Sequence, residues 1–136
     1  VALGYPLNAR QIKPALEFLY AADLPVYSIS KIYNGVEQAG LDRDLSGIQF
    51  TAMPWTLPGQ LAKELRSDET MHTAYRQLYA LGYDTFLVHR NLDKLSSVTQ
   101  SPLFGAMGVL SLSQGVIKRT GRWGEFNQGK VAEVTP

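Results

Sequence analysis

Cysteine is absent from this chain of 136 residues, and histidine occurs at only two positions, His72 and His89. The absence of cysteine excludes thiol nucleophiles, thiolate metal sites, iron–sulfur clusters and disulfide bonds. Glu69 and His72 have the Glu-x-x-His spacing of carboxylate-bridged metal sites, but the second such pair that these sites need is missing. We therefore expect neither a metal centre nor a cofactor.

Neither sign of charge dominates, because 13 basic and 12 acidic residues leave a formal net charge of +1. Such a chain has no long-range field that would steer it to nucleic acid or to an anionic membrane. Its basic cluster of Lys118, Arg119 and Arg122 is small and lies close to Glu125 in the sequence. We expect no nucleic-acid partner.

Long apolar runs are also absent, since no stretch approaches the roughly 20 apolar residues that span a bilayer. The N-terminus has neither a basic region nor a cleavage site, so we expect that any targeting signal has been removed. Val1 to Leu3 are apolar and lead through Gly4-Tyr5-Pro6 into a helix start, as an internal strand of an α/β unit does. We expect residues 1–136 to be one portion of a domain in a longer protein.

Strand and helix patterns alternate along the first part of the chain, which indicates an α/β fold. Strands are predicted at the N-terminus, at Leu24–Ser28 and at Gly47–Met53, where Pro54 stops the last. Between the first two, a helix capped by Asn8 is expected, which begins near Pro14 or bends there. Its apolar face is predicted to comprise Ile12, Leu16, Leu19 and Tyr20.

Helical patterns continue in the second half. One begins at Pro58, takes a new cap at Ser67 or Asp68, and ends at Gly82. Another, capped by Asp84, extends to Leu95. Phe86–Val88 alone could form a short strand, but the helical spacing persists to Leu95 and favours a helix.

The stretch from Gly105 to Val134 predicts two consecutive β-hairpins that close the domain. In each hairpin, apolar residues flank a turn, at Ser113-Gln114-Gly115 and at Asn127-Gln128-Gly129. Glycine can adopt the positive φ that such tight turns need.

No set of residues assembles a catalytic site in the sequence. Asp42-Arg43-Asp44 resembles the start of a calcium loop, but the position that should supply a glutamate is Met53, so a polar turn explains the run better. Ser28 and Ser30 lie at the end of a predicted strand but outside any Gly-x-Ser-x-Gly elbow. We therefore expect no catalytic residues.

Several blocks of the sequence resemble one known family. These are Gly47–Trp55, Tyr75–Asp84 and the Gly105–Val134 stretch, together with the opening segments Ala9–Pro14 and Leu24–Ser28. They closely resemble the C-terminal domain of the LppC lipoprotein family over essentially the whole chain, and the three blocks occur in the family's order. The first half of the family's two-lobed domain, its helical-repeat N-terminal domain and its lipidated cysteine have no counterpart here.

The resemblance implies part of a type I periplasmic-binding-protein-like fold, with two α/β lobes joined by crossovers and closed by the C-terminal hairpins. It also implies a non-catalytic lipoprotein module that binds a class A penicillin-binding protein and stimulates its transpeptidase, regulating cell wall synthesis and cell shape. Such proteins work in the periplasm, tethered to the inner leaflet of the outer membrane by a lipid anchor, which would lie outside this chain. Peptidoglycan is a further partner to consider.

Two other functions stay open. An enzyme on an α/β scaffold is disfavoured because no site is assembled, whereas a small-solute-binding or sensing module could use the cleft between two lobes. For such a ligand the candidate residues are Tyr5, Ser28, Ser30 and Tyr33, because loops at strand ends supply aromatic walls and hydroxyl donors. A structural role, as rim packing for the tyrosines and backbone hydrogen bonding for the serines, is favoured for each.

Overall fold

The computed structural model describes residues 2–59, 73–97 and 101–135, which form a mixed α/β structure. The chain divides into two compact units. Unit 1 comprises Val1–Ala52, Thr56–Pro58 and Arg122–Pro136, and unit 2 comprises Met53–Trp55 and Gly59–Gly121. The C-terminal region therefore contributes to both units.

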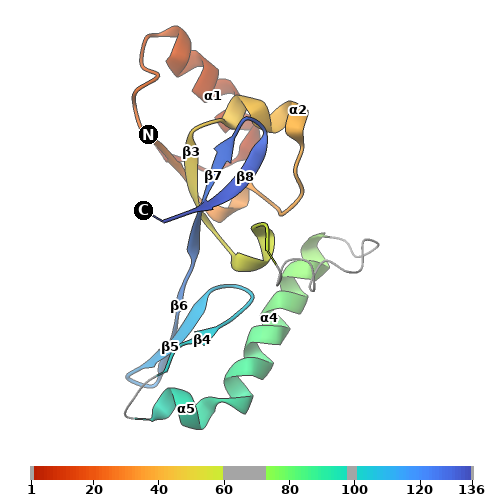
Figure 1. Ribbon diagram of the computed structural model, residues 1–136, viewed down its shortest axis with the longest axis vertical. Coiled ribbons are helices and arrows are strands. Elements are labelled where there is room, and N and C mark those ends of the chain that lie inside the picture. The colour runs from red at the N-terminus through yellow and green to blue at the C-terminus, as the bar shows by residue number, and fades with distance from the viewer. Residues whose placement is uncertain (1, 60–72, 98–100, 136) are drawn as a thin grey trace. The chain divides into compact units, whose positions relative to one another are not determined.

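A five-stranded sheet forms the centre of unit 1, in the order β1-β2-β3-β7-β8. Its strands are β1 (Ala2–Leu3), β2 (Val26–Ser28), β3 (Ile48–Ala52), β7 (Arg122–Asn127) and β8 (Lys130–Val134). The first three strands are parallel, whereas β7 pairs antiparallel with both β3 and β8 (Figure 1). The three strands predicted in the first half of the chain are confirmed.

Helix α1 (Pro6–Phe18) differs from its prediction at its start and on its buried side. The N-cap is Tyr5 rather than Asn8, because Pro6 fits the first helical position, where its fixed φ and missing N–H carry no cost. The helix contains Pro14 and buries Ala9 and Lys13. Of the predicted apolar face, Leu16 packs against the core. The prediction was wrong for Leu19 and Tyr20, which lie beyond the helix end and are exposed, Tyr20 with φ +56°.

The connection from β2 to β3 contains short helical turns and completes the core of unit 1. These are η1 (Ser30–Ile32), α2 (Ala39–Asp42) and η2 (Arg43–Leu45). Three aromatic rings pack together at the centre, with centroid separations of 5.0 Å for Phe50–Phe126, 5.8 Å for Tyr33–Phe126 and 5.9 Å for Tyr33–Phe50. They join the segment after β2 to the central strands.

Helices and a three-stranded antiparallel sheet, ordered β4-β5-β6, make up the described part of unit 2. After the turn η3 (Pro54–Thr56), its elements are α4 (Thr73–Arg90), α5 (Leu92–Ser96), β4 (Leu103–Phe104), β5 (Val109–Ser113) and β6 (Val116–Thr120) (Figure 1). Trp55, Ala80, Ala106 and Met107 form its buried cluster. The helix predicted for Phe86–Val88 is confirmed. The break predicted between Gly82 and Asp84 was wrong, because α4 continues through both residues. The helix start and cap predicted at 58–72 fall mainly on residues 60–72, outside the described residues.

Both predicted hairpin turns are present, with positive φ at Gln114 and Gly115 and at Gln128 and Gly129. The two hairpins do not form one ribbon, however. β5 and β6 belong to the sheet of unit 2, whereas β7 and β8 extend the sheet of unit 1. The chain passes from one sheet to the other at Gly121.

Candidate functional site

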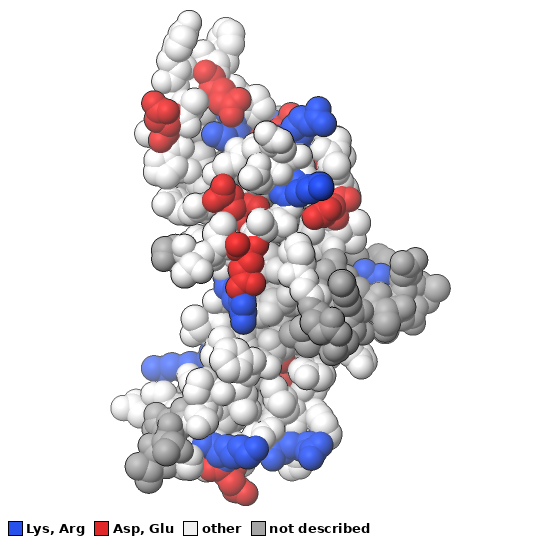
Figure 2. Space-filling model, viewed as in Figure 1, with Lys and Arg blue, Asp and Glu red and all other residues white. Residues whose placement is uncertain are grey.

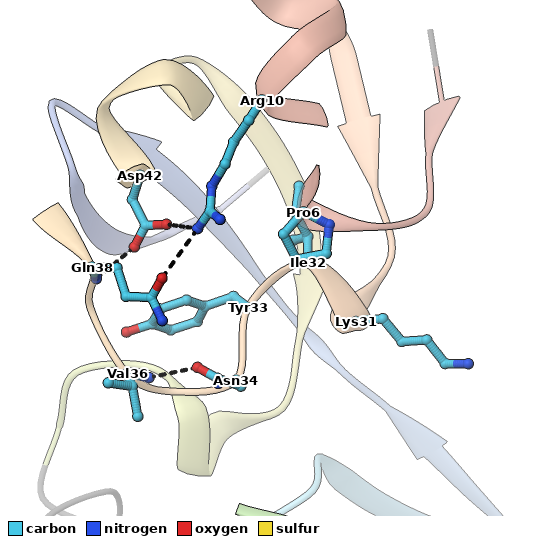
Figure 3. Close-up of a pocket in the computed structure, with 9 residues that line it drawn as sticks. All are labelled: Pro6, Arg10, Lys31, Ile32, Tyr33, Asn34, Val36, Gln38 and Asp42. Atoms are coloured by element: carbon cyan, nitrogen blue, oxygen red, sulfur yellow. Dashed lines mark hydrogen bonds and ion pairs between the residues drawn. The ribbon is translucent and has the colours of Figure 1, made fainter. Parts of the chain in front are cut away.

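A polar pocket of about 160 Å³ lies in unit 1 where the N-terminal half of α1 meets the segment after β2 (Figure 3). Pro6, Arg10, Lys31, Ile32, Tyr33, Asn34, Val36, Gln38 and Asp42 line it. Pockets for drug-sized ligands usually measure about 300 Å³ or more. This pocket is therefore sized for a small solute only.

Arg10 and Asp42 form the charged centre of this pocket. Arg10 Nη2 donates to Asp42 Oδ1 at 2.9 Å and lies 3.5 Å from Gln38 Oε1. The backbone amide of Gln38 donates to Asp42 Oδ2 at 2.8 Å. The Asp42 side chain is 5% exposed and that of Arg10 is 22% exposed. This largely buried ion pair joins α1 to α2.

The four residues predicted to bind a ligand do not all line this pocket. Tyr33 lines the pocket, whereas Tyr5, Ser28 and Ser30 do not. Ser28 is buried in β2, Ser30 begins η1, and Tyr5 is exposed with Lys31 Nζ 5.8 Å from its ring centroid. Their ligand-binding role stays a prediction, with Tyr33 the best placed.

The polar residues that line the pocket were not recognised as a group from the sequence. Asp42 was interpreted as part of a polar turn, yet its carboxylate is buried and paired with Arg10, 32 positions earlier in the chain. Lys31 and Asn34 follow the carboxyl end of β2, where open α/β sheets place their ligand contacts. This position at the end of a strand was the one signal in the sequence for a ligand site. No residue pattern near Arg10 indicates that Asp42 is its partner.

A second hollow, of about 490 Å³, lies in unit 2 between α4 and the β5–β6 hairpin. It is lined by Leu81, Asp84, Thr85, Val88, Met107, Leu110, Ile117 and Arg119. Most of these side chains are apolar. The carboxylate of Asp84 is buried and accepts hydrogen bonds from the backbone amides of Ala106 and Met107. Asp84 thus has a structural role, and this groove suits an apolar contact.

Across the described ranges, no group of three or more His, Asp or Glu side chains could hold a metal ion. On the face drawn in Figure 2, basic and acidic residues lie near one another instead of forming one large patch of a single sign. Within the same ranges, no helix has the length and apolar character required to cross a bilayer.

Comparison with solved structures identifies the fold. LpoA from Haemophilus influenzae superposes with a TM-score of 0.77 and 21% identity, over 100% of this chain and 26% of that one. The C-domain of the same protein, described as a regulator of PBP1A, superposes with a TM-score of 0.76 and 21% identity. That match covers 98% of this chain and 44% of the C-domain chain. A "putative branched-chain amino acid ABC transporter" from Chromobacterium violaceum superposes with a TM-score of 0.65 and 28% identity, over 91% of this chain and 41% of that one. The chain thus has the predicted periplasmic-binding-protein-like α/β fold.

Sequence comparison gives the family. A family model described as "LppC putative lipoprotein" matches residues 2–129. A curated relative, "Penicillin-binding protein activator LpoA" from Edwardsiella ictaluri, is 24% identical over 142 residues, a match that includes 97% of this chain. The chain spans 20% of the length of that relative. Because the family model matches nearly the whole chain, the predicted resemblance is confirmed: the chain belongs to the LppC lipoprotein family.

Proposed function

We propose that residues 1–136 are one portion of a periplasmic-binding-protein-like domain in a protein that binds and activates a class A penicillin-binding protein. The observation that carries this proposal is the family match over residues 2–129. It is supported by the names of the relatives, one a penicillin-binding protein activator and the other a regulator of PBP1A. In this role the module stimulates the transpeptidase of the synthase and so regulates cell wall synthesis.

The proposed role requires no chemistry from this chain. The charged pair of unit 1, Arg10 and Asp42, is internally neutralised, and the buried Asp84 of unit 2 is occupied by two backbone amides. A protein that activates by contact needs a surface of suitable shape and charge rather than an acid, a base or a nucleophile. The described residues therefore fit a non-catalytic module.

The proposed location follows from the same family. We infer that the complete polypeptide works in the periplasm, tethered to the inner leaflet of the outer membrane by a lipid anchor outside residues 1–136. From there it reaches the synthase at the peptidoglycan layer. Fractionation of cell envelopes with an antibody against this segment tests the location, and recovery in the cytosol would contradict it.

The activity is tested with the complete natural polypeptide that contains these residues. We expect it to co-purify with a class A penicillin-binding protein and to raise the fraction of cross-linked product made from lipid-linked precursor. Unchanged cross-linking would overturn the proposal. Two matched variants then test which unit contacts the synthase: Lys31→Glu in unit 1 and Lys118→Glu in unit 2. Both positions are exposed, so the reversed charge leaves the fold intact. Loss of activation in one variant alone assigns the contact to its unit.

A second candidate function is the binding of a small solute in the pocket of unit 1. It is supported by the polar lining around Tyr33 and by the likeness to a protein named as a branched-chain amino acid transporter. A ligand that binds only the native state raises the melting temperature, so a thermal-shift screen with amino acids and muropeptides tests it. Lys31→Ala, at an exposed position in the pocket lining, should reduce any shift and leaves the aromatic core around Tyr33 intact. If no compound raises the melting temperature, this candidate is excluded.

A further inference from the structure

Helix α4 carries large apolar side chains on the side opposite to its packed side. The packed side includes Ala80 and Asp84, which are buried. Leu78, Tyr79 and Phe86 are 62%, 55% and 59% exposed. Together with Gly82 they share one face, because helical residues three, four, seven and eight positions apart lie on the same side. We call Leu78, Tyr79, Gly82 and Phe86 the outer stripe of α4.

The outer stripe carries no charge. From Gln77 to Val88 the only charged residue is Asp84, whose buried carboxylate is bonded to Ala106 and Met107 on the packed side. Arg90 lies at the C-terminal end of the stripe, with Cζ 5.7 Å from the ring centroid of Phe86. Permanent interfaces are more hydrophobic than transient ones and resemble a domain core cut in half. The stripe therefore suits a permanent cover better than a regulatory partner that binds and leaves.

The middle of α4, from Leu78 to Val88, supports the same conclusion. Leu81, half-exposed on the side of the groove, adds a further apolar position to those of the outer stripe. A helix that is apolar on most of its circumference is normally buried between layers of a larger structure. At the middle of the stripe, a Cβ added at Gly82 would meet no atom within 4 Å, so a neighbouring layer can approach the helix closely there.

The comparisons indicate where such a cover could come from. The match to the C-domain of LpoA from Haemophilus influenzae includes 98% of this chain but 44% of that domain. More than half of that relative's domain thus lies outside the matched part. We propose that the outer stripe of α4 is an intramolecular interface, covered permanently by an apolar layer from the remainder of the same polypeptide. This inference rests on the proposed membership of a larger domain.

Chemical modification of Tyr79 tests the inference. The complete natural polypeptide and the isolated 136-residue chain are treated with N-acetylimidazole, and modification of each tyrosine is followed by mass spectrometry. Rates in guanidinium chloride give the unprotected reference. We expect Tyr79 to react several-fold more slowly in the native complete polypeptide than in denaturant. In the isolated chain it should react nearly as fast as in denaturant.

Each other outcome overturns the inference. Equal and fast reaction in both native proteins would mean that nothing covers the stripe. Protection in the isolated chain that increases with concentration would identify a second copy as the cover. Protection of the complete polypeptide only after the synthase is added would identify the stripe as the docking surface. A failure of the activation assay alone would leave the reactivity of Tyr79 unchanged, so the two proposals fail separately.

A pair of substitutions on the same helix provides a second measurement. Tyr79→Ser should lower the melting temperature of the complete polypeptide by several degrees, because it removes an apolar side chain from a buried interface. Gln77→Ser, also at an exposed position of α4, serves as the matched control and should leave the melting temperature nearly unchanged. Equal melting temperatures for the two variants would contradict the inference.

Discussion

The carboxylate of Asp84, in the middle of α4, accepts a hydrogen bond from the backbone amide of Met107 at 3.0 Å. Its other oxygen accepts the amide of Ala106. Burial of a carboxylate costs free energy unless hydrogen bonds replace its hydration, and these two amides do so. Asp84 also closes over Gly105, where an added Cβ would lie 2.6 Å from its Oδ1. This one side chain therefore fixes the turn before β5 onto the helix.

Replacement of that carboxylate should destabilise unit 2. We expect Asp84→Ala to lower the free energy of unfolding by about 3 kcal/mol, because two buried amides lose charge-assisted hydrogen bonds. Urea denaturation followed by circular dichroism measures the loss. Asp93→Ala, at an exposed position in α5, is the control and should change stability by about 0.5 kcal/mol or less. Similar effects of the two substitutions would mean that the Asp84 contacts contribute little.

The Arg10–Asp42 pair should contribute far more to the free energy of unfolding than the ion pair between Arg122 and Glu133. Arg10→Met leaves the Asp42 carboxylate buried without its cation, which costs about 3 to 5 kcal/mol. Arg122→Met removes a pair whose side chains are both well exposed, so the expected loss is below about 1 kcal/mol. The same denaturation experiment measures both variants. Equal losses would show that burial does not distinguish these pairs.

Gly124 of β7 occupies a position where no side chain fits. An added Cβ would lie 2.7 Å from Phe50 Cζ and 3.0 Å from Leu57 Cδ2, in the core of unit 1. Overpacking of this kind typically costs about 1 to 3 kcal/mol, so Gly124→Ala should lower the denaturation midpoint clearly. Gly40→Ala in α2 is the control, because a Cβ there meets no atom within 4 Å. It should leave stability unchanged or raise it by up to about 1 kcal/mol.

Strands and tight turns were predictable because their signals are local. The apolar runs at Val26–Ser28 and Ile48–Ala52 and the two Gln-Gly turns each depend on residues within a short window. The assignment of the two hairpins to different sheets was not predictable in the same way. It depends on the pairing of β7 with β3, for example Phe50 with Gly124, which no local pattern encodes.

The continuity of α4 was missed because Gly82 and Asp84 are usual residues at helix ends. A glycine inside a helix costs about 1 kcal/mol, which argued for a break there. Tertiary contacts outweigh this cost: the Asp84 carboxylate bonds the amide of Ala106, 22 positions later. The pocket of unit 1 was missed for the same physical reason, since Arg10 and Asp42 are distant in sequence. In both cases the deciding interaction is a buried, long-range charge contact.

The turn between β5 and β6 offers a stabilising substitution. Gln114 adopts φ +53° and Gly115 φ +77°, so the turn places a residue with a side chain in the left-handed region. Asparagine tolerates that region better than glutamine, and Asn-Gly is the preferred pair in such turns. We expect Gln114→Asn to raise the free energy of unfolding by about 0.5 kcal/mol, since part of the backbone strain is relieved.

A matched substitution separates this effect from a general effect of asparagine. Gln77→Asn, at an exposed position of α4, should lower stability by a few tenths of a kcal/mol because asparagine has the lower helix propensity. Denaturant midpoints of the two variants should therefore move in opposite directions from that of the original chain. A midpoint that falls for Gln114→Asn would show that the glutamine side chain makes a stabilising contact which outweighs the strain of its backbone.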